Sequence, residues 1–98
     1  MTAVARVGDL DTPFLTVPVI VTGSTDVFIG GRPVAREGDF TGTFKKKQGS
    51  KTLTLTSQLL APSGEQTVFI NGKSVAQIGT PGTNGTKVIT GSETVFIG

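Results

Sequence analysis

The amino-acid sequence predicts an all-β fold: a small single domain, 1–98, of short strands and hairpins with pseudo-threefold internal repeats. The length of 98 residues is typical of one domain. The 14 Gly and 5 Pro, together with many Thr, Val and Ser, favour short strands and tight turns. No stretch has the 3.6-residue apolar rhythm of a helix. Most informative is that the sequence repeats itself, because internal repeats predict architecture directly.

One motif occurs three times along the chain. It starts with Gly, passes through a polar turn and ends in the triplet Val-Phe-Ile, and its copies are 23–30, 64–71 and 91–98. These residue types favour a strand. Strand alternation places the Val and Ile of each triplet on one face and the Phe on the other. One face fills the core, and the sequence does not decide which.

A second motif follows the first as 31–39 and 72–80, and a shortened copy, 4–9, opens the chain. The chain therefore consists of a half unit, two full units and a closing half unit, which predicts three units in a closed ring. Between the two motifs, Gly30-Gly31 and Asn71-Gly72 predict two-residue hairpin turns with positive φ. The second motif ends in a further set of predicted structural turns, at Gly8, Asp9, Gly38, Asp39 and Gly79.

Three variable connections join the units, at 10–21, 40–60 and 81–88. The second is the longest and carries four lysines between Lys45 and Lys51, which account for much of the net charge of +2. We expect a solvated loop there, with phosphate contact as the less favoured alternative. The alternation in Thr52–Thr56 predicts an extra strand with two leucines facing one side.

The composition disfavours most classes of catalytic and binding site. The chain has no Cys and no His, which removes disulfides, the commonest general base and the usual catalytic triad. Asp9 and Asp39 suggest a hydrolase with paired carboxylates, but their matching repeat positions favour a turn-closing role. The Gly-rich stretch 79–86 lacks the Lys-Ser/Thr ending and the helix of a phosphate-binding loop. We expect no catalytic residues and no enzyme, and no nucleic-acid partner because no aromatic residues interleave with the lysines.

The segments 22–29 and 31–39, which include the tetrad Pro33–Arg36, resemble the PAAR-repeat family, whose members form the tips of phage tail spikes and type VI secretion spikes. The tetrad departs from Pro-Ala-Ala-Arg at Val34, and the second copy, 74–77, departs further. The resemblance covers nearly the whole chain. Within the family the chain is most similar to the short spike-tip proteins of T-even phage baseplates.

The resemblance implies a non-enzymatic cone with three sheet-like faces. Its base would cap a trimeric β-helical spike, one tip chain per trimer, and its apex would touch the target cell membrane transiently. No apolar run is long enough to span a bilayer and no N-terminal signal pattern is present, so we expect synthesis in the host cytoplasm. The resemblance implies a place in the virion, at the tip of the tail baseplate spike. The expected partner-binding residues are those of the three triplets: Val27, Phe28, Ile29, Val68, Phe69, Ile70, Val95, Phe96 and Ile97.

Two alternatives remain open at this stage. The first is a type VI secretion spike tip, and the second is a small β-domain that binds carbohydrate or peptide. The repeats begin within four residues of the N-terminus and run to Gly98, so we expect no fused effector, which favours the phage tip. The absence of Trp and Tyr disfavours a carbohydrate groove.

Many members of the family hold a zinc ion near the apex with three His and one Cys placed after the Gly-Asp turns. The matching stretches here, 10–14, 40–44 and 81–85, contain neither residue, so we expect the zinc site to be lost and no cofactor to be present. A hard cation on Asp9, Asp11 and Asp39 is the less favoured alternative. In place of the metal we expect packing in the apex loops, whose residues are Leu10, Phe14, Phe40, Phe44 and Pro81.

Overall fold

The computed structural model describes residues 2–11, 17–60 and 68–97, and every regular element in these ranges is a strand. The strands are β1 (Thr2–Ala3), β2 (Phe28–Ile29), β3 (Arg32–Pro33), β4 (Phe44–Gln48), β5 (Lys51–Leu55), β6 (Phe69–Ile70), β7 (Lys73–Ser74) and β8 (Phe96–Ile97). They form four antiparallel pairs, β1–β8, β2–β3, β4–β5 and β6–β7. The all-β prediction is confirmed. Within the described ranges, no helix has the length and apolarity needed to cross a membrane.

The two full units fold as the predicted hairpins. Ile29 pairs with Arg32 across the turn of β2–β3, and Ile70 pairs with Lys73 across that of β6–β7. Both turn residues have positive φ in each hairpin, 61° and 79° in Gly30-Gly31 and 54° and 78° in Asn71-Gly72. Two successive positive φ values define the type I′ turn, whose twist matches that of the flanking strands. The turn prediction is therefore confirmed.

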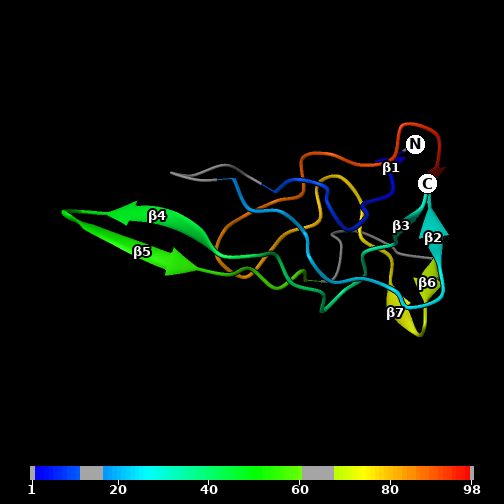
Figure 1. The fold of residues 1–98 in the computed structure, drawn as a ribbon, viewed down its shortest axis with the longest axis horizontal. Helices are drawn as coiled ribbons and strands as arrows, with labels where there is room; N and C mark the ends of the chain where they lie inside the picture. The colour runs from blue at the N-terminus through cyan, green and yellow to red at the C-terminus, as the bar shows by residue number, and fades with distance from the viewer. Residues whose placement is uncertain (1, 12–16, 61–67, 98) are drawn as a thin grey trace.

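The two half units complete the third hairpin. Thr2 in β1 pairs with Ile97 in β8, and Ala3 pairs with Phe96. This register matches the other two hairpins, with strands from opposite ends of the chain in place of a turn. Figure 1 shows β1 and the C-terminus at the same end of the molecule as β2, β3, β6 and β7. We call this end, formed by β1–β3 and β6–β8, the strand end.

The second connection forms a hairpin of its own, β4–β5, which we call the distal hairpin. Five residue pairs join its strands, from Phe44 with Leu55 to Gln48 with Lys51, and Gly49 in its turn has a φ of 62°. The lysine run was expected to be a solvated loop and is instead part of β4. The strand expected around Thr52–Thr56 is confirmed as β5, with Leu53 and Leu55 both half-buried on one face.

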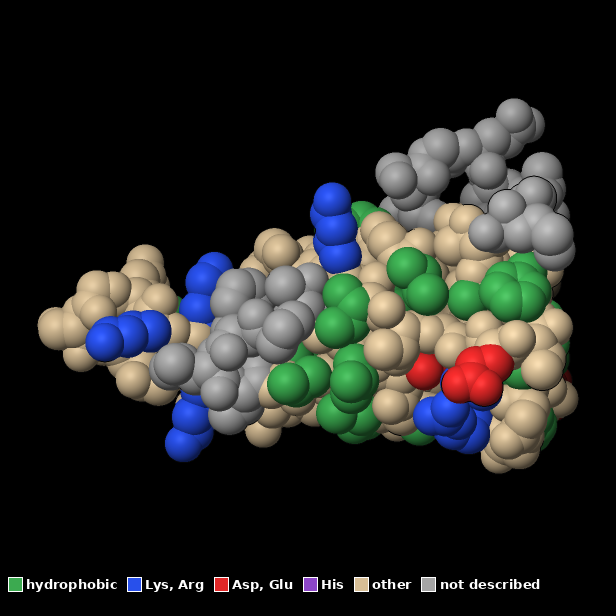
Figure 2. Space-filling model, turned by 90° about the horizontal axis from the view of Figure 1, so that it is seen from above, with side chains coloured by type: hydrophobic (Ala, Val, Ile, Leu, Met, Phe, Trp, Pro, Cys, Tyr) green, Lys and Arg blue, Asp and Glu red, His purple; other side chains and the backbone are tan. Residues whose placement is uncertain are grey.

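The distal hairpin gives the molecule its long axis. It projects away from the strand end, so that the molecule narrows from one end to the other (Figure 1). The three principal extents are 42, 27 and 22 Å. Lys and Arg side chains surround the projecting end in the space-filling view (Figure 2). Among the described strands, β4 and β5 pack only on each other.

A closed cycle of backbone hydrogen bonds ties the three units together. The amide of Ala5 donates to the carbonyl of Ala76 (2.9 Å), that of Ala76 to Ala35 (3.0 Å), and that of Ala35 back to Ala5 (3.0 Å). All three alanines are fully buried, at 0% exposure. Three backbones that converge on one axis leave little room for side chains, which suits alanine. The predicted ring of three units is confirmed.

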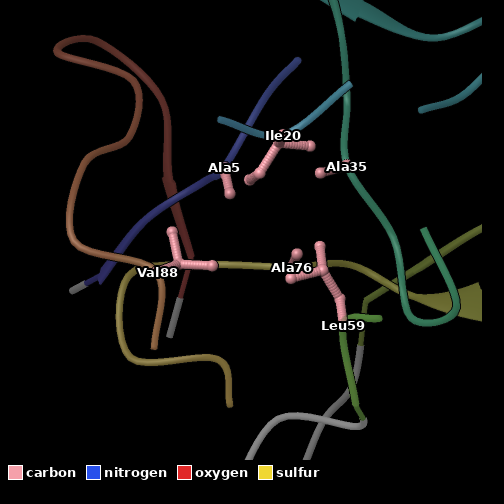
Figure 3. Packing of buried hydrophobic residues seen from close by; sticks show 6 residues of the cluster. All are labelled: Ala5, Ile20, Ala35, Leu59, Ala76 and Val88. Carbon is pink, nitrogen blue, oxygen red and sulfur yellow. The ribbon is translucent and has the colours of Figure 1, made fainter. Parts of the chain in front are cut away.

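The connections complete the core on one side of the alanine cycle. The amides of Gly8, Gly38 and Gly79 each donate to a connection carbonyl at 2.8 Å. These bonds hold one apolar residue of each connection over the axis. The six side chains of this cluster converge in Figure 3, and they are Ala5, Ile20, Ala35, Leu59, Ala76 and Val88.

A second apolar cluster lies on the strand-end side of the cycle. It is centred on Val4, Val34 and Val75, all buried. The half-buried residues that pack against it are the inward positions of the triplets: Val27, Ile29, Val68, Ile70 and Ile97. The Val and Ile face therefore lies against the core, and the Phe face lies away from it.

Candidate functional site

The strand end carries an exposed Phe at the same position of each unit. Phe28 is 54% exposed, Phe69 58% and Phe96 42%. Phe28 and Phe69 each follow a Val that packs against the second core cluster, so the pleat turns these Phe outward. An exposed Phe forgoes about 1.5–3 kcal/mol that full burial would supply. Each unit therefore exposes one Phe at the equivalent position of its hairpin.

The triplet residues expected to bind the partner are thus divided between two faces. Val27, Ile29, Val68, Ile70 and Ile97 belong mainly to the second core cluster. The three Phe are exposed, as is Val95 at 38%. All nine lie at the strand end, so the structure brings them together as one end of the molecule. The Phe face is the exposed face of this end, and the Val and Ile face is the one that packs against the core.

The Gly-Asp turns are closed by their own carboxylates. Asp9 Oδ2 accepts from the backbone amide of Arg6 (2.8 Å) and from its Nε (3.2 Å). Asp39 does the same with Arg36, at 2.8 and 3.1 Å. Both carboxylates are buried. They are therefore held by arginine and backbone amides, which is what a turn-closing role requires.

The second full unit shows that this turn can close without a carboxylate. Gln77 and Thr80 stand where the other units have Arg and Asp, and the Thr80 hydroxyl accepts from the Gln77 amide at 2.9 Å. The glycines of the three turns, Gly8, Gly38 and Gly79, have nearly equal φ values of 93°, 91° and 94°. Arg6 and Arg36 each form an ion pair with the Asp three residues later in the same unit.

A polar contact between units lies at the β6–β7 turn. Asn71 Nδ2 donates to Asp26 Oδ1 (2.9 Å), and Asn71 Oδ1 accepts from Arg36 (3.0 Å) and from the Ser24 hydroxyl (2.8 Å). The hydrogen bonds from Asn71 and, to a smaller extent, Ser24 hold the pKa of Asp26 below its ordinary value. The sequence signal for this contact was the Asn that replaces Gly30 in the second copy of the turn.

The residues expected at the apex are not assembled into one apolar cluster. Phe44 is buried at 1% exposure, whereas Phe40 is 45% exposed and Leu10 is half-buried. Leu10, Phe40 and Pro81 pair with Val19, Gln58 and Lys87 at matching outer positions of the three units. Phe14 lies outside the described residues.

Polar side chains occupy the interior next to these positions. Asp11, Thr41 and Gly82, one residue further along each unit, form matching bridges to Val88, Ile20 and Leu59. Both Asp11 and Thr41 are buried, together with Ser57 and Thr86. Thr41 accepts from the Ser57 amide at 2.9 Å, and Thr86 hydrogen-bonds Ser57 at the same distance. Strand alternation explains this arrangement, because the residue after Leu10, Phe40 and Pro81 is the one that turns inward.

The side chains present do not suit the zinc ion of the family. A structural zinc site needs thiolate or imidazole ligands, and the described parts of the three connections offer hydroxyl, amide and carboxylate oxygens. The carboxylates of Asp9 and Asp39 belong to different units and are each engaged by an arginine. Within residues 2–11, 17–60 and 68–97, no three acidic, His or Cys residues lie close enough to hold a metal.

Part of the chain matches a known protein family. Residues 2–42 match the family model described as the PAAR motif. No curated protein matches the chain. The matched segment covers the first half unit and the first full unit, with both Arg-Asp pairs and two of the three alanines of the cycle. The same backbone pattern continues through the second full unit. These findings support a place for the chain among the PAAR-repeat proteins, a family associated with the spike tips of contractile injection systems.

Proposed function

We propose that this protein is the non-enzymatic tip of a trimeric β-helical spike in a phage tail, a contractile injection machine, and that it sharpens the spike for penetration of the cell envelope. The observation that carries the proposal is the hydrogen-bond cycle of Ala5, Ala35 and Ala76. It gives a single chain near-threefold symmetry. One molecule can therefore present similar surfaces to three identical subunits.

The physical need for such a cap follows from the end of a trimeric β-helix. Three equivalent chains end there with unpaired strand edges, which promote aggregation unless they are covered. The strand end offers short strands for edge-to-edge addition and three exposed Phe for burial. An interface of about 800 Å² per partner would suffice for a specific complex.

The phage assignment rests on the resemblance to short phage spike tips, and a type VI secretion spike tip is the alternative. Mass spectrometry of purified virions tests it directly, with the chain expected at one copy per tail. Its detection instead in the spike fraction of a secretion apparatus, and not in virions, would support the alternative.

Docking is tested by mixing the chain with a trimeric β-helical spike fragment. Native mass spectrometry should show one chain per trimer. Phe69→Asp should weaken binding at least about tenfold, because one buried Phe is worth about 1.5–3 kcal/mol. Phe69 is 58% exposed, so this variant should fold normally.

Phe40→Asp is the matched control. Phe40 is also an exposed Phe, at 45%, but it lies in a connection rather than at the strand end. It should leave spike binding unchanged. Three chains per trimer, or equal losses in the two variants, would contradict docking through the strand end.

A further inference from the structure

The charge of the distal hairpin is one-sided. The segment 40–60 contains Lys45, Lys46, Lys47 and Lys51 and no Asp or Glu. Its local charge of four exceeds the net charge of +2 of the whole chain. The remaining cations are mixed with acidic residues, and two of them, Arg6 and Arg36, are held by Asp9 and Asp39. The lysines of the hairpin are thus the main local excess of positive charge.

The strand register places this charge on both faces of the ribbon. Lys45 and Lys47 stand opposite Thr54 and Thr52, and all four are exposed. The other face is apolar at its root, where Phe44 pairs with Leu55, and becomes cationic towards the turn, where Gln48 pairs with Lys51. The distal hairpin is therefore apolar where it joins the rest of the chain and rich in lysine towards its turn.

Like charges lie close together on the distal hairpin. Lys45 and Lys47 lie two residues apart on one face, where like charges repel. None of the residues directly opposite them is acidic, since the partners are Thr54, Leu53, Thr52 and Gln48. Because segment 40–60 contains four lysines and no Asp or Glu, a partner that supplies negative groups would complement its charge.

We propose that the distal hairpin binds an anionic lipid surface through contacts between its lysines and headgroup phosphates. Charge complementarity favours such a surface, and the hairpin projects from the rest of the molecule (Figure 1). A nucleic acid is a poorer match because the hairpin has no exposed aromatic side chain on which bases could stack. The hairpin lies at the opposite end of the 42 Å axis from the strand end. Its role as the leading point rests on the proposed function, which docks the strand end on the spike.

The strength of this interaction follows from the charge. Each lysine held near an anionic bilayer strengthens partitioning by about fivefold. Four lysines acting together give roughly 10²–10³-fold. The Debye length falls from about 10 Å at 0.1 M salt to about 3 Å at 1 M, so binding should be lost at high salt.

Vesicle co-sedimentation of the full chain tests the inference. The probes are vesicles of phosphatidylcholine alone and vesicles with about a third phosphatidylglycerol. We expect binding to the anionic vesicles only. The paired substitution K47Q/K51Q should weaken it by roughly 25-fold, from two lysines at about fivefold each. The matched control K73Q/K87Q removes two exposed lysines elsewhere and should change binding by no more than about twofold.

Several outcomes would overturn the inference. Equal losses in the two double variants would show that overall charge, not the hairpin, controls binding. Equal binding to neutral vesicles would show that charge is not the cause. Competition by millimolar inorganic phosphate would indicate a site for free phosphate, and tighter binding to a DNA duplex than to anionic vesicles would indicate a nucleic-acid site.

Spike binding separates this inference from the proposed function. K47Q/K51Q should bind the trimeric spike fragment as the parent chain does, and Phe69→Asp should still bind anionic vesicles. Failure of vesicle binding with intact spike binding removes the lipid inference alone. Failure of spike binding with intact vesicle binding removes the proposed function alone.

Discussion

At the scale of single residues, equivalent positions of the three turns have the same backbone geometry although their side chains differ chemically. The turn after each returning strand is closed by Asp9 or Asp39 in two units and by Thr80 in the third. What these side chains share is an oxygen that accepts from the amide three residues earlier. The fold requires this hydrogen-bond acceptor, and the ion pair between arginine and aspartate is additional to it.

This comparison predicts the effect of substitutions at Asp39. Asp39→Ala leaves the backbone amide and Nε of Arg36 without their acceptor, which should cost about 1.5–3 kcal/mol of unfolding free energy. The double variant R36Q/D39T copies Gln77 and Thr80 of the second full unit and should be clearly more stable than Asp39→Ala. Urea denaturation measures both. A double variant no more stable than the single one would show that the arginine pair itself is required.

At the scale of elements, the hairpin turns were predictable and the lysine strand was not. Gly30-Gly31 and Asn71-Gly72 are local signals, because few residues adopt two positive φ values in succession. A run of three lysines has no alternation, so nothing in it distinguishes a strand from a loop. β4 exists because β5 supplies its hydrogen-bond partners and the Phe44–Leu55 pair provides its root.

The turn of β6–β7 also predicts a pH effect. Because the folded state lowers the pKa of Asp26, the contribution of this carboxylate is present above its ordinary pKa and is lost as the pH falls through the folded value. Asn71→Gly keeps the turn, since it recreates the Gly-Gly pair of β2–β3. It removes the main hydrogen bond to Asp26, so the pKa of Asp26 should rise. An NMR titration of the Asp26 carboxyl measures it, and an unchanged value would mean that Asn71 does not hold this carboxylate.

At the scale of the whole molecule, the chain is a ring of three units that is open at one hairpin turn. Thr2 and Ile97 pair as Arg32 and Ile29 do, and two residues, Gly98 and Met1, lie in sequence where the other hairpins have their turns. A two-residue link between Ile97 and Thr2 would give this hairpin the same turn length as the other two. Such a chain should tolerate its ends being moved.

A circular permutant tests this symmetry. It joins residue 98 to residue 1, with Met1→Gly to recreate a Gly-Gly turn, and starts at Ser50 in the exposed turn of the distal hairpin. Exposed loop tips tolerate new ends well, so the unfolding free energy should stay within about 1 kcal/mol of the parent. Thermal and urea unfolding measure it. An unfolded permutant would contradict the equivalence of the third hairpin.

The amino-acid sequence by itself determined the all-β class, the number of units, the turns and the resemblance to PAAR-repeat proteins. These features depend on local signals and on copies that can be compared directly. Only the tertiary structure decided that Phe28, Phe69 and Phe96 face outward. It alone also decided that Asp11 and Thr41, rather than Leu10 and Phe40, turn inward. Strand alternation predicts which residues share a face. Which of the two faces is buried depends on where the other units place their strands.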